Sequence, residues 1–270
     1  MGRAQPRREN ERGDDGGDFP VSDATSQPGP LRLKYLRPQQ VRDALSRDPR
    51  LIVPVGTTEQ HGPHLPLGAD TILIDRLADD LSAEFGILRA PTVEYGVNAS
   101  TRASYPGNAS VRRKTLHRFM NDLVGSWEEG GVEGFIILTA HGHDPHQEAL
   151  STLRTIRATI RTVDIFTVRL EGEDARLPSH GGALDTSLLL YLDANLVDLD
   201  LAEDYVPLPS RVRAWRKLAR RSIPPEGPGS VGRPTRSSVE TGERLYEFIF
   251  ERIASGIFGR PARPLRTPRV

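Results

Sequence analysis

Short runs of apolar residues alternate with longer segments of helical periodicity along most of the chain. Continuous apolar runs predict buried strands, and apolar residues at every third or fourth position predict amphipathic helices. Strands are predicted at 51–56, 87–96, 135–140 and 163–170, and helices at 70–85, 112–129, 145–160, 182–193 and 238–254. Alternation of this kind predicts an α/β fold, a three-layer α/β/α sandwich around a mostly parallel central sheet.

The pattern is lost at both ends of the chain. Residues 1–30 are rich in Gly, Pro, Asp and Arg and nearly lack large apolar side chains, which predicts a disordered N-terminal tail. One domain is expected over 31–258, followed by a flexible C-terminal tail at 259–270. The stretch 206–237 holds six prolines and is predicted to be irregular.

Composition limits the function classes. The 36 Lys and Arg side chains balance 36 Asp and Glu, which argues against nucleic acid or an anionic membrane as partner. Cysteine is absent, so a bound metal would have to sit on histidine and carboxylate. No apolar run reaches the roughly 18 residues of a membrane span, and the N-terminal residues lack the apolar stretch of an export signal. A soluble, cytoplasmic protein is expected.

The polar loop after the first long predicted strand is the most informative segment. Glu59 and His61 stand two residues apart in a loop stiffened by Gly and Pro, and Asp70 follows at a predicted helix N-cap. Such side chains can serve two different ions with a carboxylate bridging them, as in hydrolases with metal pairs about 3.5–4 Å apart. Each residue alone could cap backbone or pack in the core, but the whole segment favours a metal centre.

A second cluster follows the strand predicted at 135–140. His141, His143 and His146 lie within six residues around a glycine, a density typical of metal ligands. His146 is expected to be an ordinary exposed residue, and His143 could be either exposed or a ligand. Both polar loops follow strands directly, where α/β folds collect their ligands.

A third cluster precedes the helix predicted at 182–193. His180 stands before that helix and Asp185 lies in its first turn. An acid in this position also complements the helix dipole, so Asp185 alone would carry no functional meaning.

The segment from Pro54 to Asp70 resembles the signature of the creatininase (creatinine amidohydrolase) family. The similarity continues through 105–108, His141, 180–187 and 232–235, and spans about residues 35–256. The resemblance implies a creatininase-like α/β fold with two divalent metal ions, Zn²⁺ in the first place and Mn²⁺ or Fe²⁺ as alternatives. It also implies a homo-oligomer, since several members are hexamers.

Roles follow from the resemblance by position. Glu59 and His61 would each bind one ion, Asp70 would bridge both, and His141 would complete the site that Glu59 shares. His180 would match the family histidine that moves protons to and from the substrate amide.

The sequence also departs from the family pattern. Asp185 replaces the usual glutamate and would lie at or near the second ion. His143 occupies the place of a glutamate ligand and could bind that ion in its stead. Ala183 stands where many members carry glutamate. These changes argue against creatinine itself as the substrate.

The predicted activity is metal-dependent hydrolysis of a cyclic or linear amide bond by a metal-activated water, on a small-molecule amide or a peptide. One alternative is a peptidase or lactam hydrolase that matures a biosynthetic precursor peptide. Another is a catalytically inactive family member that acts as a scaffold.

Overall fold

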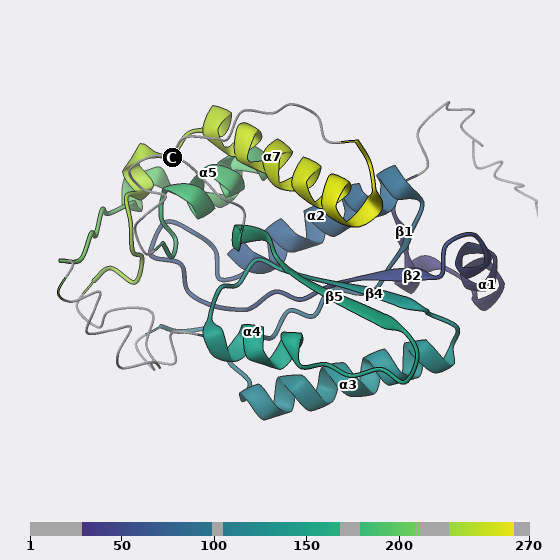
Figure 1. Ribbon diagram of the computed structural model, residues 1–270. Coiled ribbons are helices and arrows are strands. Elements are labelled where there is room, and N and C mark those ends of the chain that lie inside the picture. The colour runs from purple at the N-terminus through teal and green to yellow at the C-terminus, as the bar shows by residue number, and fades with distance from the viewer. Residues whose placement is uncertain (1–28, 99–104, 168–178, 209, 211–226, 262–270) are drawn as a thin grey trace, which may run out of the picture.

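A single parallel sheet forms the centre of the molecule (Figure 1). The structure is a computed structural model and describes residues 29–98, 105–167, 179–208, 210 and 227–261. Five strands are hydrogen-bonded in the order β1-β3-β2-β4-β5, and every pair is parallel. The strands are β1 Leu31–Arg32, β2 Arg50–Pro54, β3 Leu88–Arg89, β4 Gly134–Thr139 and β5 Thr159–Asp164.

Helices cover both faces of this sheet. Helices α2, α5 and α7 lie over one face, and α3 and α4 lie over the other (Figure 1). The predicted three-layer α/β/α sandwich is therefore confirmed. The bounds are α1 Pro38–Arg47, α2 Ala69–Phe85, α3 Arg113–Glu129, α4 Asp144–Ser151, α5 Ala183–Leu192 and α7 Val239–Phe258, with short 3₁₀ turns at Leu33–Tyr35, Ile165–Thr167, Ala194–Leu196, Leu199–Leu201 and Pro234–Arg236.

The two central strands explain why the sheet is buried on both sides. In β2, Ile52 packs into the core beneath α2, α5 and α7, while its neighbours Leu51 and Val53 pack into the core beneath α1, α3 and α4. Strand β4 alternates in the same way. Successive side chains point to opposite faces of a strand, so a run that is apolar at every position fits a sheet covered on both sides.

Three predicted elements differ from the structure. The strand expected at 87–96 is reduced to Leu88–Arg89, because Pro91 has no N–H for a ladder hydrogen bond. The helix expected at 145–160 ends at Ser151, and the strand expected at 163–170 begins instead at Thr159. Strand β5 lies at the edge of the sheet and exposes part of its side chains, so it lacks the apolar run that marks a buried strand.

Most of both predicted tails and about half of the 206–237 stretch lie outside the described residues, and the conformations of those parts stay predictions. Within the described part of the chain, no helix has both the length and the apolar character that crossing a bilayer requires.

A buried ion-pair network ties α2 to the sheet edge. The Asp79 carboxylate accepts hydrogen bonds from Nε of Arg32 and Nε of Arg89, both at 2.8 Å. The Arg89 side chain is only 2% exposed, and it also pairs with Asp75. Burial alone would raise the pKa of Asp79, but the hydrogen bonds and charges of the two guanidinium groups hold it below its usual 3.8.

This network predicts how the stability depends on pH. Because the folded-state pKa of Asp79 is lower than its unfolded-state value, the charged carboxylate adds stability above about pH 4. That contribution is lost as the pH falls through the folded-state value. Urea unfolding of the wild type and of Asp79→Asn should therefore give free energies that differ at pH 6 and converge towards pH 3. A difference that grows as the pH falls would contradict this assignment.

Candidate metal centre

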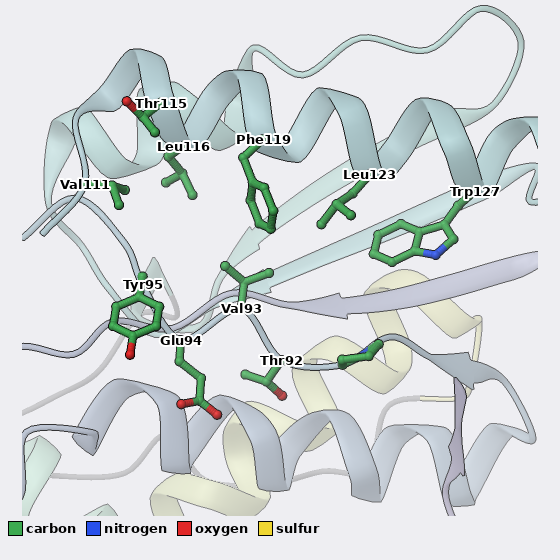
Figure 2. Close-up of a pocket in the computed structure, with 11 residues that line it drawn as sticks. Thr92, Val93, Glu94, Tyr95, Val111, Thr115, Leu116, Phe119, Leu123 and Trp127 are labelled. Atoms are coloured by element: carbon green, nitrogen blue, oxygen red, sulfur yellow. The ribbon is translucent and has the colours of Figure 1, made fainter. Parts of the chain in front are cut away.

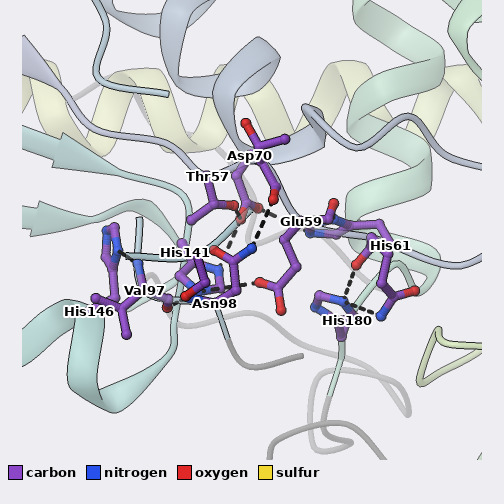
Figure 3. A network of polar contacts seen from close by, with 12 residues as sticks. Thr57, Glu59, His61, Asp70, Val97, Asn98, His141, His146 and His180 are labelled. Atoms are coloured by element: carbon purple, nitrogen blue, oxygen red, sulfur yellow. Dashed lines mark hydrogen bonds and ion pairs between the residues drawn. The ribbon is translucent and has the colours of Figure 1, made fainter. Parts of the chain in front are cut away.

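The loop between β2 and α2 supplies two of the predicted ligands, Glu59 and His61, and the first turn of α2 supplies a third, Asp70. Helix α2 is capped by Gly68, not by Asp70 as predicted; Asp70 lies in the first turn. Its carboxylate is therefore not used as a cap. It instead accepts a 2.7 Å hydrogen bond from the Thr57 hydroxyl and turns into a buried polar cluster just past the carboxyl ends of β2 and β4 (Figure 3).

Three side chains of this cluster converge most tightly. One ligand atom each from Glu59, Asp70 and His141 lies within 4.8 Å of the others, and all three side chains are buried. Glu59 is completely inaccessible to solvent. Burying ionised carboxylates is costly unless positive charge compensates them, so this group demands a cation or protonated partners.

His61 joins the cluster through one oxygen of Asp70. Its Nδ1 donates a hydrogen bond to the main-chain carbonyl of Glu59 at 3.0 Å, which assigns the ring proton to Nδ1. The other nitrogen, Nε2, lies 3.2 Å from Asp70 Oδ1. In the neutral ring Nε2 carries no proton and can only accept a hydrogen bond. The carboxylate oxygen that it faces can also only accept, so the two atoms need a cation or a proton between them.

His141 repeats this arrangement on the other oxygen of Asp70. Its Nε2 donates to the main-chain carbonyl of Val97 at 3.1 Å and lies 3.5 Å from Glu59 Oε2, while Nδ1 lies 2.9 Å from Asp70 Oδ2. Metal-binding histidines characteristically donate their second nitrogen to a carbonyl or carboxylate in this way. Asp70 thus presents one oxygen to each of two imidazoles whose tautomers are set by backbone carbonyls.

The electrostatics of the cluster favour positive charge between these groups. Burial alone would lower the pKa of His61, but the negative charges of Asp70, Asp185 and Glu59 raise it to about 10. The pKa of His141 is raised by Asp70 and Glu59 against the same burial effect. The pKa of Asp70 is held well below its usual value, although burial opposes this, because both imidazoles face it. A set of imidazole and carboxylate donors of this kind fits Zn²⁺ or Mn²⁺.

The third sequence cluster lies against the same site. The His180 ring stacks on that of His61, with centroids 4.3 Å apart, and its Nε2 donates to the Gln60 main-chain carbonyl at 2.6 Å. Gly181 follows with a φ of 59°, and a Cβ at this position would collide with the carbonyl of His61. Two loops far apart in the sequence therefore meet in close backbone contact.

The two candidate ligands for a second ion differ in their placement. Asp185 is buried at the start of α5, where its Oδ2 accepts from the Gly182 amide at 3.3 Å. Burial raises the pKa of this carboxyl group. His143 is half-buried at the N-cap of α4, with its ring centroid 6.0 Å from that of His141. Both lie beside the converging group, and their roles as ligands stay predictions.

The structure corrects the prediction for His146. This side chain is fully buried rather than exposed, and its ring is nearly perpendicular to that of His141, with centroids 5.0 Å apart. Sequence reasoning also missed Thr57 and Gln60. Thr57 lies two residues before Glu59 and Gln60 lies between Glu59 and His61, so their proximity in sequence was the available signal.

A separate apolar groove lies between helix α3 and the segment after β3 (Figure 2). Its volume is about 610 Å³. Phe119, Leu123 and Trp127 line it from the helix, and Val93 and Tyr95 line it from the facing segment. It shares none of its lining residues with the buried polar cluster, so the groove and the cluster are separate features.

Several known proteins are similar to this chain in sequence or in fold. A mycofactocin precursor peptide peptidase from Mycolicibacterium smegmatis is 29% identical over 224 residues, covering 76% of this chain and 83% of that protein. A creatinine amidohydrolase from Pseudomonas putida is 24% identical over 234 residues, covering 77% and 88%. The crystal structure of a creatinine amidohydrolase superimposes with a TM-score of 0.69 at 23% identity, covering 87% of this chain and 99% of that one.

The family profile described as creatinine amidohydrolase matches residues 34–257, which is most of the chain and agrees with the span of the resemblance seen in the sequence. This match confirms that resemblance, and the chain belongs to the creatininase family.

Proposed function

We propose that this protein is a metal-dependent amide hydrolase whose centre is formed by Glu59, His61, Asp70 and His141. The observation that carries the proposal is the position of Asp70, with one carboxylate oxygen opposite each of two imidazole nitrogens. Related structures described as creatininase of Zn–Zn type and creatininase with Mn support a divalent cation here. Two ions, with Zn²⁺ as the first candidate, are part of the proposal, as are Asp185 and His143 as further ligands.

The surrounding residues suit the chemistry of amide cleavage. Bound divalent ions would supply a water of lowered pKa and polarise the amide carbonyl. His180 is proposed as the group that moves the proton. Because its Nε2 donates to the Gln60 carbonyl, Nδ1 is the nitrogen that can accept a proton from the attacking water and pass it to the leaving nitrogen.

Metal removal tests the proposal directly. Protein stripped with a chelator should lose hydrolase activity and regain it with Zn²⁺ or Mn²⁺. It should also unfold at a lower temperature, because an ion at about a thousand times its Kd stabilises the folded state by ~4 kcal/mol. Elemental analysis, amide hydrolysis and thermal unfolding are the measurements. Full activity after exhaustive chelation would refute the metal-dependent mechanism, and wild-type protein that binds no divalent ion would favour the scaffold alternative.

A peptide substrate is the second candidate. It is favoured by the 29% identity to the mycofactocin precursor peptide peptidase over 224 residues, against 24% to the creatinine amidohydrolase. The metal-loaded protein should be assayed in parallel on precursor-type peptides, small lactams and creatinine. Turnover of peptides alone would assign the protein to the peptidases, and turnover of lactams alone to the small-molecule amidohydrolases. The homo-oligomer and the cytoplasmic location stay predictions.

A further inference from the structure

His146 lies in a narrow buried space that adjoins the candidate metal centre. It lies on α4, directly behind His141, and none of its side chain is accessible to solvent. This space exists because Gly96 has no side chain: a Cβ at this glycine would lie 2.5 Å from Thr57 Cγ2 and 2.7 Å from Nδ1 of His146. The backbone at Gly96 therefore packs directly against the His146 imidazole.

Both ring nitrogens of His146 are hydrogen-bonded, and the partners determine the direction of each bond. The main-chain N–H of Val97 can only donate, so Nδ1 accepts at 3.2 Å and carries no proton. The ring proton is then on Nε2, which lies 3.1 Å from Thr139 Oγ1 and donates to it. The same hydroxyl oxygen accepts from the main-chain N–H of His141 at 3.2 Å. The ring is thus neutral and fixed in one tautomer.

These bonds connect His146 to His141 by two routes. Val97 donates its N–H to His146 and accepts from Nε2 of His141 through its carbonyl (Figure 3). The Thr139 hydroxyl oxygen accepts a hydrogen bond from Nε2 of His146 and another from the main-chain N–H of His141. The first route sets which nitrogen of His141 carries the proton, and the second sets where its main chain lies.

We infer that His146 is a positioning residue for the proposed metal centre: it fixes Val97 and Thr139, and through them keeps Nδ1 of His141 aimed at Asp70. The inference rests on the proposed function, since it gives His141 the part of a ligand. Side chains that orient metal ligands from behind typically affect metal affinity by about 10–100-fold.

The test compares two variants of His146 by zinc affinity, measured by competition with a chelating dye. His146→Leu removes both hydrogen-bonding atoms, and zinc affinity should fall about 10–100-fold. His146→Asn places its carbonyl oxygen close to the position of Nδ1, where it can accept from Val97, and should recover much of that loss. The absorption spectrum of bound Co²⁺ should change in His146→Leu, because the geometry at His141 is no longer fixed.

Three further variants guard against misfolding and general destabilisation. If His146→Leu does not fold, Thr139→Val and Thr139→Ser replace it: the first loses the hydroxyl and should weaken zinc binding, and the second keeps it. Asp79→Asn serves as the control, since it lowers stability far from the cluster and should leave zinc affinity unchanged in folded protein.

The outcomes separate this inference from the proposed function. Wild-type protein that binds no Zn²⁺ would refute the metal centre and this inference together. Zinc binding by the wild type, with equal affinity and the same cobalt spectrum in folded His146→Leu, would refute the positioning role alone.

Discussion

Replacing Asp70 with alanine is expected to abolish metal binding and to reduce amide hydrolysis by at least about a thousandfold, ~4 kcal/mol of transition-state stabilisation. The reason is geometric, since the Asp70 carboxylate faces His61 Nε2 with one oxygen and His141 Nδ1 with the other. Without it the two imidazoles keep their backbone partners but lose the anion that brings them to a common cation. Elemental analysis and turnover on the amide that the wild type cleaves are the measurements.

Asp80→Asn provides the matched control for this experiment. Asp80 lies on the same helix, pairs with Arg76 and accepts from the Tyr246 hydroxyl, which an asparagine oxygen can also do. That variant should keep wild-type metal content and activity. Full metal occupancy together with turnover in Asp70→Ala would remove the bridging role, whereas loss of both in Asp80→Asn would show that the assay reports on folding.

The second large effect concerns stability rather than chemistry. Asp79→Ala should lower the free energy of unfolding by about 3 kcal/mol, because it leaves the buried guanidinium of Arg89 with incomplete compensation. Arg89 keeps Asp75 and the carbonyl of Ala90 as partners, so the loss is placed at the lower end of the range for broken buried pairs. Urea unfolding at pH 7 measures it.

Arg76→Ala is the comparison for this variant. It breaks the ion pair with Asp80 on the same helix, but these side chains are 52% and 33% exposed, so the loss should stay below about 0.5 kcal/mol. Equal losses in the two variants would contradict the argument that burial makes the Arg89 network contribute more to the free energy of unfolding than an exposed ion pair does.

The sequence predicted the layered fold because both central strands read as continuous apolar runs. Leu51 to Val53 and Phe135 to Leu138 are buried on both faces, which only a sheet between two helical layers allows. Strand β5 gave no such signal. Its residues at 159–164 mix charged and apolar side chains at the sheet edge. The pattern therefore placed 159–160 in a predicted helix that in fact ends at Ser151, and it predicted that the strand begins only at 163.

The candidate ligands could be predicted from the sequence, but the residues that pack behind them could not. Glu59, His61, Asp70 and His141 form a recognisable set in the sequence, and the structure brings them together. The burial of His146 was not predictable, because it depends on Gly96 and Val97, some fifty residues earlier in the chain. Contacts of that separation leave no periodic pattern in the sequence.

The strand order also governs when this cluster can exist. Glu59 and Asp70 are made early in the chain, but His141 reaches them only after β4 has docked beside β2, and His180 only after the loop before α5 has closed onto His61. Contacts between residues this far apart in the sequence are slow to form, because the intervening chain must lose conformational entropy first. In a partly folded chain these carboxylates and imidazoles would lie apart and would bind metal ions only weakly. High metal affinity would therefore be a property of the folded protein alone.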